Sequence, residues 1–223
     1  MLLDRALVEL YEKLRETYGP QRWWPGDTAF EVMVGAILTQ NTNWANVEKA
    51  IGRLKEHDAL EPERLAALND EELQELIRPA GYFRQKAARL KRLVWWLGET
   101  CDGDLDLLDQ WPTDELRQEL VSLRGIGPET ADSILLYALE RPVFVVDTYT
   151  NRITVRHELL DPGCGYHDLQ LLFTDHLPDD LELYKDFHAQ LVQVGKRHCR
   201  PTPRCEGCPV KEVLGEPVLE EEC

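Results

Sequence analysis

Two glycines and a proline form the segment of the sequence best suited to bind a phosphate. Residues 123–127 read Leu-Arg-Gly-Ile-Gly between two helical stretches, and Pro128 follows them. Glycine permits a positive φ and lets a phosphate approach the backbone amides, while proline suits the first turn of a helix, whose N-terminus favours an anion. The segment therefore predicts a phosphate-binding turn, although a plain connection between helices can need the same glycines.

Three cysteines near the end of the sequence have a spacing that suggests metal ligands. They are Cys199, Cys205 and Cys208, in a chain with six cysteines altogether. The first residues form an amphipathic stretch without the pattern of a signal peptide, so we expect a cytoplasmic protein, in which disulfides are rare. The sequence therefore predicts a metal site in preference to a disulfide framework.

The charge balance by itself argues against broad attraction to nucleic acid. The 223 residues include 25 Lys and Arg against 41 Asp and Glu, which gives a net charge of −16, whereas phosphate binding draws on clustered basic groups. Two basic clusters can present a DNA-binding face or a merely solvated one. They comprise Arg84, Lys86, Arg89, Lys91 and Arg92, and then Lys196, Arg197, Arg200 and Arg204.

Helical signals extend along the whole chain and predict an all-α protein. Thr28 and Glu31 have the spacing of a capping box. Asn43 can cap the next helix, and Asn69 precedes three acidic residues that suit the start of another. A long helix is expected from Phe83 to about Gly98, and another from about Thr113. The short apolar stretch 142–146 is interpreted as a connector. The sequence contains no run of eighteen apolar residues, so no membrane helix is expected.

The turn and the residues that follow it resemble the endonuclease III superfamily of helix-hairpin-helix DNA glycosylases. Val-Val-Asp-Thr-Tyr at residues 145–149 follows the turn, and the matching motifs are spread from about residue 23 to residue 208. The resemblance implies a two-lobed all-α fold, with a helical domain at 28–138 and a second lobe from 1–27 and 139–223. It also implies that a base flipped out of double-stranded DNA is held between the lobes.

The resemblance assigns the residues that act on DNA. Asp147 matches the family's carboxylate, which stabilises the positive charge that builds on the sugar as the N-glycosidic bond breaks and can orient the attacking water. An isolated Asp in front of Thr148 would instead be interpreted as a helix cap, and one residue can do both. Gln40 and Tyr82 match the family's two insertion loops. The hairpin would bind a phosphate, with a monovalent cation as a further ligand, through Gly125, Ile126, Gly127 and Thr130.

Glu129 stands where bifunctional members of the superfamily carry a Schiff-base lysine, two positions after the second hairpin glycine. A carboxylate cannot form an imine. We therefore expect a monofunctional glycosylase with weak or absent lyase activity. Glu129 would also favour the N-terminus of a helix through the dipole, which is compatible with the first interpretation.

Several tryptophans make the sequence most similar to the 3-methyladenine glycosylase branch. By that resemblance Trp23, Trp24 and Trp44 line the base pocket with Lys196. Aromatic faces suit an N-alkylated purine, since it carries a positive charge and has lost its stacking partners. Core packing remains the alternative for the tryptophans, and a basic helix end for Lys196. Three further tryptophans are expected in the core, namely Trp95, Trp96 and Trp111.

The cysteine segment resembles the 4Fe-4S loop of the superfamily, with two departures. The first gap is five residues where the family has six, and Leu214 stands where the family has its fourth cysteine. Cys223, or less favourably Cys164, would then complete a four-thiolate site with a structural role. A zinc site and a metal-free loop stay open as alternatives.

Two other functions compete with this interpretation of a monomeric repair enzyme. One is an endonuclease III-type glycosylase and lyase for oxidised pyrimidines or mispaired uracil and thymine. The other is a DNA-binding module that keeps the hairpin without catalysis.

Overall fold

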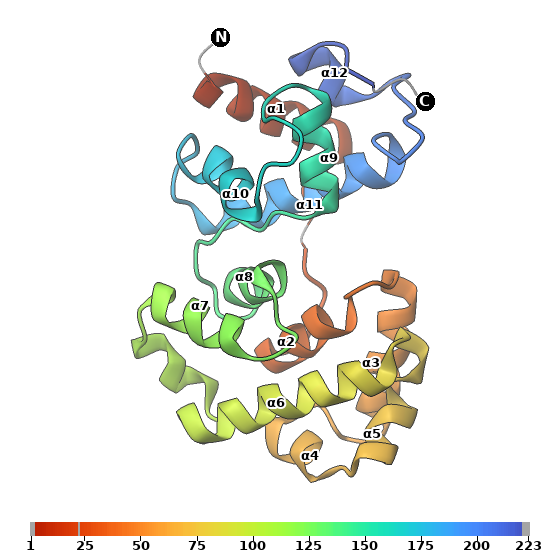
Figure 1. Ribbon diagram of the computed structural model, residues 1–223, viewed down its shortest axis with the longest axis vertical. Helices are drawn as coiled ribbons and strands as arrows, with labels where there is room; N and C mark the ends of the chain where they lie inside the picture. The colour runs from red at the N-terminus through yellow and green to blue at the C-terminus, as the bar shows by residue number, and fades with distance from the viewer. Residues whose placement is uncertain (1–2, 22, 220–223) are drawn as a thin grey trace. The chain divides into compact units, whose positions relative to one another are not determined.

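The computed structural model describes residues 3–21 and 23–219, and its regular elements are all helices within that part of the chain. The chain forms two compact units, one from residues 24–141 and one from residues 1–23 with 142–223 (Figure 1). The expected boundaries at 28 and 138 thus differ from these by a few residues. No helix in the described ranges is both long and apolar enough to cross a membrane.

The first of these units, residues 24–141, contains two helices that bury nearly all of their side chains. Helix α2 is buried from Phe30 to Leu38, and α8 is buried from Thr130 to Tyr137. Both belong to a layer that the long helix α6 completes, since α2 packs against α8 and against α6. The elements of this unit are α2 (Ala29–Leu38), α3 (Trp44–Glu56), α4 (Pro62–Ala67), α5 (Asp70–Leu76), η1 (Arg78–Ala80), α6 (Phe83–Cys101), η2 (Leu105–Gln110), α7 (Thr113–Ser122) and α8 (Pro128–Tyr137).

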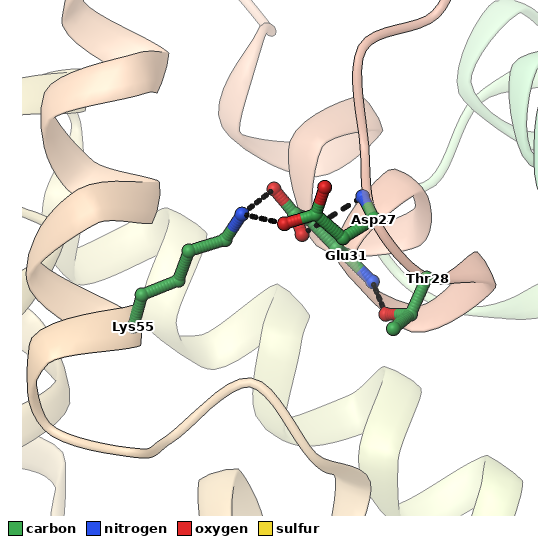
Figure 2. Close-up of polar contacts among 4 residues, drawn as sticks. All are labelled: Asp27, Thr28, Glu31 and Lys55. Carbon is green, nitrogen blue, oxygen red and sulfur yellow. Dashed lines mark hydrogen bonds and ion pairs between the residues drawn. The ribbon is translucent and has the colours of Figure 1, made fainter.

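Side-chain caps fix where several of these helices begin. Thr28 accepts a hydrogen bond from the Glu31 amide at 3.1 Å, as its position predicts, but the Glu31 carboxylate accepts from the Asp27 amide rather than from Thr28 (Figure 2). Lys55 of α3 then pairs with both Asp27 (2.6 Å) and Glu31 (2.8 Å), which joins α3 to the start of α2. At α5 the capping box is complete, because Asn69 and Glu72 bond each other's amides at 2.9 and 3.0 Å.

The second unit packs its helices around an aromatic core. Phe144 lies in the irregular segment that we predicted as a connector, and its ring stacks on Phe173 at 4.3 Å. Gln170 donates to the Phe144 carbonyl at 2.8 Å, so the buried connector keeps a hydrogen-bond partner without a sheet. The elements of this unit are α1 (Leu3–Tyr18), α9 (Thr148–Arg156), α10 (Tyr166–Thr174), α11 (Leu181–Arg197) and α12 (Pro209–Leu214).

Two of the three tryptophans expected in the core are not buried. Trp96 is buried, but Trp95 is 64% exposed and Trp111 is only partly covered. The buried positions Leu90, Leu93 and Leu97 lie on one face of α6. Trp95, two residues from Leu93, points away from that face because successive residues are about 100° apart around a helix.

Candidate active site and DNA-binding hairpin

The hairpin between α7 and α8 has the backbone that its glycines predict. Gly125 takes a φ of +98°, and the amide of buried Ile126 donates to the Leu123 carbonyl at 2.9 Å. Gly127 directly precedes α8, and Pro128 occupies its first turn. A Cβ built on Gly127 meets no atom within 4 Å. The exposed side of Gly127 therefore leaves room for a ligand to approach the backbone closely.

Gly125 also lies very close to the side chain of Arg89. A Cβ on Gly125 would lie 2.5 Å from the Arg89 Nε and 2.9 Å from its Cγ. The Arg89 side chain of α6 thus lies directly against the turn, so the long helix supports the hairpin from inside this unit.

Gln40 is tied to the hairpin rather than extended from the protein. Its Nε2 donates to the Gly125 carbonyl at 3.2 Å and to the Thr130 hydroxyl at 2.8 Å. Its Oε1 accepts a short hydrogen bond from Arg89. Gln40, Gly125 and Thr130, which the sequence connects with DNA separately, therefore form one network with Arg89. Sequence reasoning placed Arg89 only in a basic cluster and missed this contact.

Tyr82 is the aromatic residue in the second predicted insertion loop, and its backbone is strained. It has a φ of +47° immediately before α6, and its side chain is 61% exposed. A bulky residue in the left-handed region costs free energy, and such strain concentrates at functional sites. An exposed aromatic ring held in this way is suited to wedge between bases.

Asp147 caps α9 in the other unit. Its Oδ1 accepts from the Thr150 amide at 2.7 Å and from the Thr150 hydroxyl at 2.9 Å. The Asp147 Oδ2 lies 3.9 Å from the Nε2 of His188, a residue of α11. The side chain of Asp147 is only 11% exposed. One carboxylate oxygen is therefore engaged by the helix, and the other faces an imidazole.

The surroundings of Asp147 keep it ionised. Burial alone would raise the pKa of Asp147, but the imidazole of His188 and the two donors of Thr150 outweigh burial and hold the pKa below its usual value of 3.8. The anion is thus fixed in place at neutral pH. His188 was absent from the sequence-based site, because a histidine 41 positions away on a helix face carries no local motif.

Lys196 and Trp23 lie together in the same unit as Asp147. The Lys196 ammonium is 5.0 Å from the centroid of the Trp23 ring. Removal from solvent lowers the pKa of Lys196, and the negative charge of Asp147 opposes that shift. Two of the residues that the resemblance places in the base pocket, Trp23 and Lys196, are therefore in contact, within the electrostatic reach of the carboxylate.

Trp24 and Trp44 come together in residues 24–141. Their rings meet edge to face, with centroids 5.4 Å apart at 87°, and Trp24 also lies 5.3 Å from Tyr137. Trp24 packs on Gly35, where an added Cβ would be 3.2 Å from the indole nitrogen. A cavity of about 290 Å³ beside them also includes Glu48 in its lining. The four predicted pocket residues thus form two pairs, one in each unit.

Glu129 occupies the first turn of α8 and is exposed. Its carbonyl accepts from the Ser133 hydroxyl at 2.7 Å within the helix. The carboxylate therefore stands at the helix end that the sequence predicts, beside the hairpin glycines.

The cysteine loop lacks a complete metal site in the residues described. Cys199, Cys205 and Cys208 line one cavity of about 10 Å³, which is room for roughly one water molecule. Burial and the neighbouring thiols raise the pKa of Cys208. No group of three ligands poised to hold a metal occurs in the described ranges. Cys223 lies outside those ranges, and the Cys164 thiol instead contacts the Asn151 amide oxygen at 3.7 Å. The three thiols around this cavity are one short of the four thiolates that a 4Fe-4S cluster uses.

The comparisons with known proteins agree with this geometry. The sequence profile of HhH-GPD superfamily base excision DNA repair proteins matches residues 34–178. A Methanocaldococcus jannaschii protein named as a putative DNA repair glycosylase is 45% identical over 92% of this chain and 94% of its own length. Endonuclease III of Thermotoga maritima is 32% identical, over 82% and 80%.

Solved structures extend the comparison to the fold. H. pylori 3-methyladenine DNA glycosylase bound to 1,N6-ethenoadenine has a TM-score of 0.75 and 28% identity, covering 88% of this chain and 98% of that one. A trapped endonuclease III–DNA covalent intermediate has a TM-score of 0.81 and 24% identity, covering 96% of each chain. The second of these supports the fold alone.

Proposed function

The chain belongs to the HhH-GPD superfamily of base excision DNA repair proteins, and from this premise we propose that it is a monofunctional DNA glycosylase for cationic, alkylated purines. The observation that carries the proposal is the buried, ionised Asp147 at the N-terminus of α9. Base excision is the activity that the superfamily name states. The absence of lyase activity and the choice of substrate are our own inferences.

In the proposed reaction Asp147 acts on the sugar of the damaged nucleotide. Departure of the base leaves positive charge on the deoxyribose, and a fixed carboxylate stabilises that charge more than it stabilises the ground state. Thr150 holds one oxygen of Asp147, so the other oxygen is left for the sugar or for the attacking water. His188 keeps this oxygen ionised when no DNA is bound.

The hairpin and the two insertion loops would provide the grip on DNA. The backbone at Gly125 and Gly127 is suited to a phosphate, with a monovalent cation as an additional ligand, by the resemblance stated above. Tyr82 and Gln40 would fill the space that the flipped base leaves. These elements belong to the part of the chain that the superfamily profile covers.

The substrate preference rests on the aromatic residues and their charged neighbours. Trp44 is held edge-on by Trp24, and Trp23 is paired with Lys196. Indole faces stack on a flipped base and attract a cationic one through the ring quadrupole. The H. pylori structure, whose ligand is a modified adenine, supports a purine. An alkylated purine is already a good leaving group, so no strong general acid is needed.

Substitution of Asp147 tests the chemical step. Asp147→Asn keeps a cap oxygen for Thr150 and removes the charge, so we expect a folded protein that binds lesion-containing duplex DNA and has lost base excision. Asp180→Asn is the matched control, since Asp180 caps α11 in the same way by accepting from the Leu183 amide at 2.8 Å. Unchanged excision by Asp147→Asn would refute the mechanism.

A panel of defined lesions tests the substrate. We expect release of 3-methyladenine from alkylated duplex DNA, and little release from duplexes with oxidised pyrimidines or with mispaired uracil or thymine. The similarity to T. maritima endonuclease III favours the oxidised pyrimidine as the second candidate. Release of oxidised bases without 3-methyladenine would overturn our choice.

Borohydride trapping tests the role of Glu129. The wild-type protein should give no covalent adduct with DNA, because an imine requires an amine. Glu129→Lys places an amine at the position of the family's lysine, and we expect a trapped adduct and strand cleavage from that variant. An adduct of equal yield in the wild type would show that another amine serves as nucleophile.

The iron–sulfur cluster remains a prediction of the sequence. A protein purified without oxygen should show the broad absorption of a 4Fe-4S cluster and about four irons per chain if the loop binds one. Zinc or no metal would agree better with the small cavity between Cys199, Cys205 and Cys208.

A further inference from the structure

Lys86 is a completely buried lysine in the basic cluster of α6, and the mechanism does not use it. Its exposed fraction is 0%, and its ammonium donates to the carbonyls of Leu38 at 2.9 Å and Ala80 at 2.8 Å. These carbonyls belong to the last residues of α2 and η1. Two residues further along the chain from each carbonyl stand Gln40 and Tyr82. One side chain therefore connects the bases of both predicted insertion loops.

A lysine in this place has a clear physical function. The last carbonyls of a helix have no partner within the helix and carry the negative end of its dipole, so a buried cation satisfies two such ends at once. Burial also destabilises the charged form of this lysine, since burial and the charge of Arg89 lower the pKa of Lys86 to about 8. An apolar residue would avoid that cost, but it would leave both carbonyls without a donor.

Arg89, nearly one turn further along α6, continues the same arrangement. It donates to Gln40 and lies against Gly125 of the hairpin. Arg92, on the next turn, donates to the carbonyl of Arg124 at 3.1 Å. The face of α6 that bears these three residues therefore contacts the base of each loop and the phosphate-binding turn.

We propose that Lys86 and Arg89 are positioning residues that set the Gln40 loop, the Tyr82 loop and the hairpin in register for base flipping. The proposal rests on the proposed function in one respect, since it takes Gln40 and Tyr82 to enter the DNA. Lys86 and Arg89 act from within the protein, on backbone carbonyls and on Gln40. Strain in both loops fits this function, because Asn41 (φ +54°) and Tyr82 (φ +47°) are held in the left-handed region.

Lys91 of the same helix supplies a matched control. Its ammonium donates to the carbonyls of Leu65 and Ala66, at 3.2 and 2.8 Å, and also to that of Leu68, at the end of α4. Lys91 thus performs the same carbonyl capping, but on residues that belong neither to the two insertion loops nor to the hairpin. Lys86→Met and Lys91→Met remove the same chemical group from one helix and differ in what that group positions.

The test compares these variants in base flipping. The readout is the fluorescence of 2-aminopurine opposite a stable abasic analogue in duplex DNA, at a temperature where both variants are folded by circular dichroism. We expect Lys86→Met to weaken the flipped complex and slow excision about 100-fold, the scale of a small misplacement. Lys91→Met should retain wild-type values. Equal effects of the two substitutions would overturn the proposal.

Two further measurements keep the outcome decisive. If Lys86→Met does not fold, Lys86→Gln retains a donor for one carbonyl and should fold with an intermediate loss. Hydrogen exchange of the DNA-free protein should quicken about fivefold or more at residues 39–42 and 81–83 in Lys86→Met, and not in Lys91→Met. Unchanged exchange at both loops would also refute the positioning function. This readout is independent of catalysis, whereas a wild-type protein that excises no base would refute the proposed function.

Discussion

Gly195 provides the sharpest test of the packing that supports the carboxylate. It lies in α11, and a Cβ at this position would come within 2.1 Å of Cδ1, 2.4 Å of Cγ and 2.6 Å of Cβ of Tyr149 in α9. Carbon atoms in contact prefer about 3.5–4.0 Å, so Gly195→Ala requires the two helices to separate or α9 to shift. The atoms that clash are close to the backbone of Tyr149, so rotation of its ring cannot relieve them. Asp147, two residues before Tyr149, would move with α9.

The expected size of the effect follows from two opposing contributions. Overpacking costs about 3 kcal/mol at the upper end of its range, and replacing glycine by alanine in a helix returns about 1 kcal/mol. The net loss of about 2 kcal/mol should lower the Tm by about 4–8 °C in a chain of this size. Excision should fall by more than the unfolded fraction explains.

Gly98 is the matched control for this substitution. It also lies within a helix, α6, but an added Cβ meets nothing within 4 Å. Gly98→Ala should therefore raise the unfolding free energy by about 0.5–1 kcal/mol. Urea unfolding and thermal scans of both variants decide the matter. A Gly195→Ala protein as stable as Gly98→Ala would refute the close packing of α9 on α11.

Three further predictions concern buried charges. Asp132 is fully buried and makes a bidentate pair with Arg117 at 2.6 and 3.0 Å, so Asp132→Ala should cost about 3 kcal/mol in urea unfolding. The pKa of Lys86 is about 8 in the folded chain against 10.5 in the unfolded chain. Between these two pH values only the unfolded chain holds the extra proton, so the unfolding free energy rises with pH. The stability of the wild type relative to Lys86→Met should therefore increase by up to about 3 kcal/mol between pH 8 and 10.5. The pKa of Asp147 is lowered, so its contribution is present above pH 3.8 and lost below it. Wild type and Asp147→Asn should accordingly converge in acid unfolding.

The sequence predicted most reliably those features that depend on neighbouring residues. The helix start at Asn69, the positive φ at Gly125 and the cap formed by Asp147 are all local, and the structure confirms each of them. The capping box predicted at Thr28 and Glu31 is only half formed, and a complete one occurs instead at Asn69 and Glu72. Hydrophobic spacing also predicted the long helix from Phe83, although the helix continues to Cys101. Local backbone rules are sufficient for such features because few conformations compete with them.

Long-range partners could not be predicted in this way. Charge alone does not reveal whether a lysine on α6 faces solvent, a phosphate or a carbonyl, and Lys86 proved to be fully buried. His188 approaches Asp147 only because α11 packs on α9. Trp95 was wrongly assigned to the core because a tryptophan's usual burial was allowed to outweigh its helical position. Each of these outcomes depends on tertiary packing, which is not encoded in spacing along the chain.

The contacts of the basic residues of α6 also bear on how an acidic chain would bind DNA. Of the cluster on α6, Lys86 and Lys91 bind carbonyls and Arg89 binds Gln40, so these side chains are already engaged within the protein. These three side chains then offer little charge to phosphates, so we expect backbone amides at the hairpin and inserted side chains such as Tyr82 to contribute to the affinity. Each phosphate neutralised by a basic side chain contributes about −0.9 to the slope of log K against log salt. A slope no steeper than about −3 would agree with a small number of contacts between basic side chains and phosphates, since it corresponds to roughly three of them. A slope near −6 would instead require about twice as many phosphate contacts and would refute this expectation.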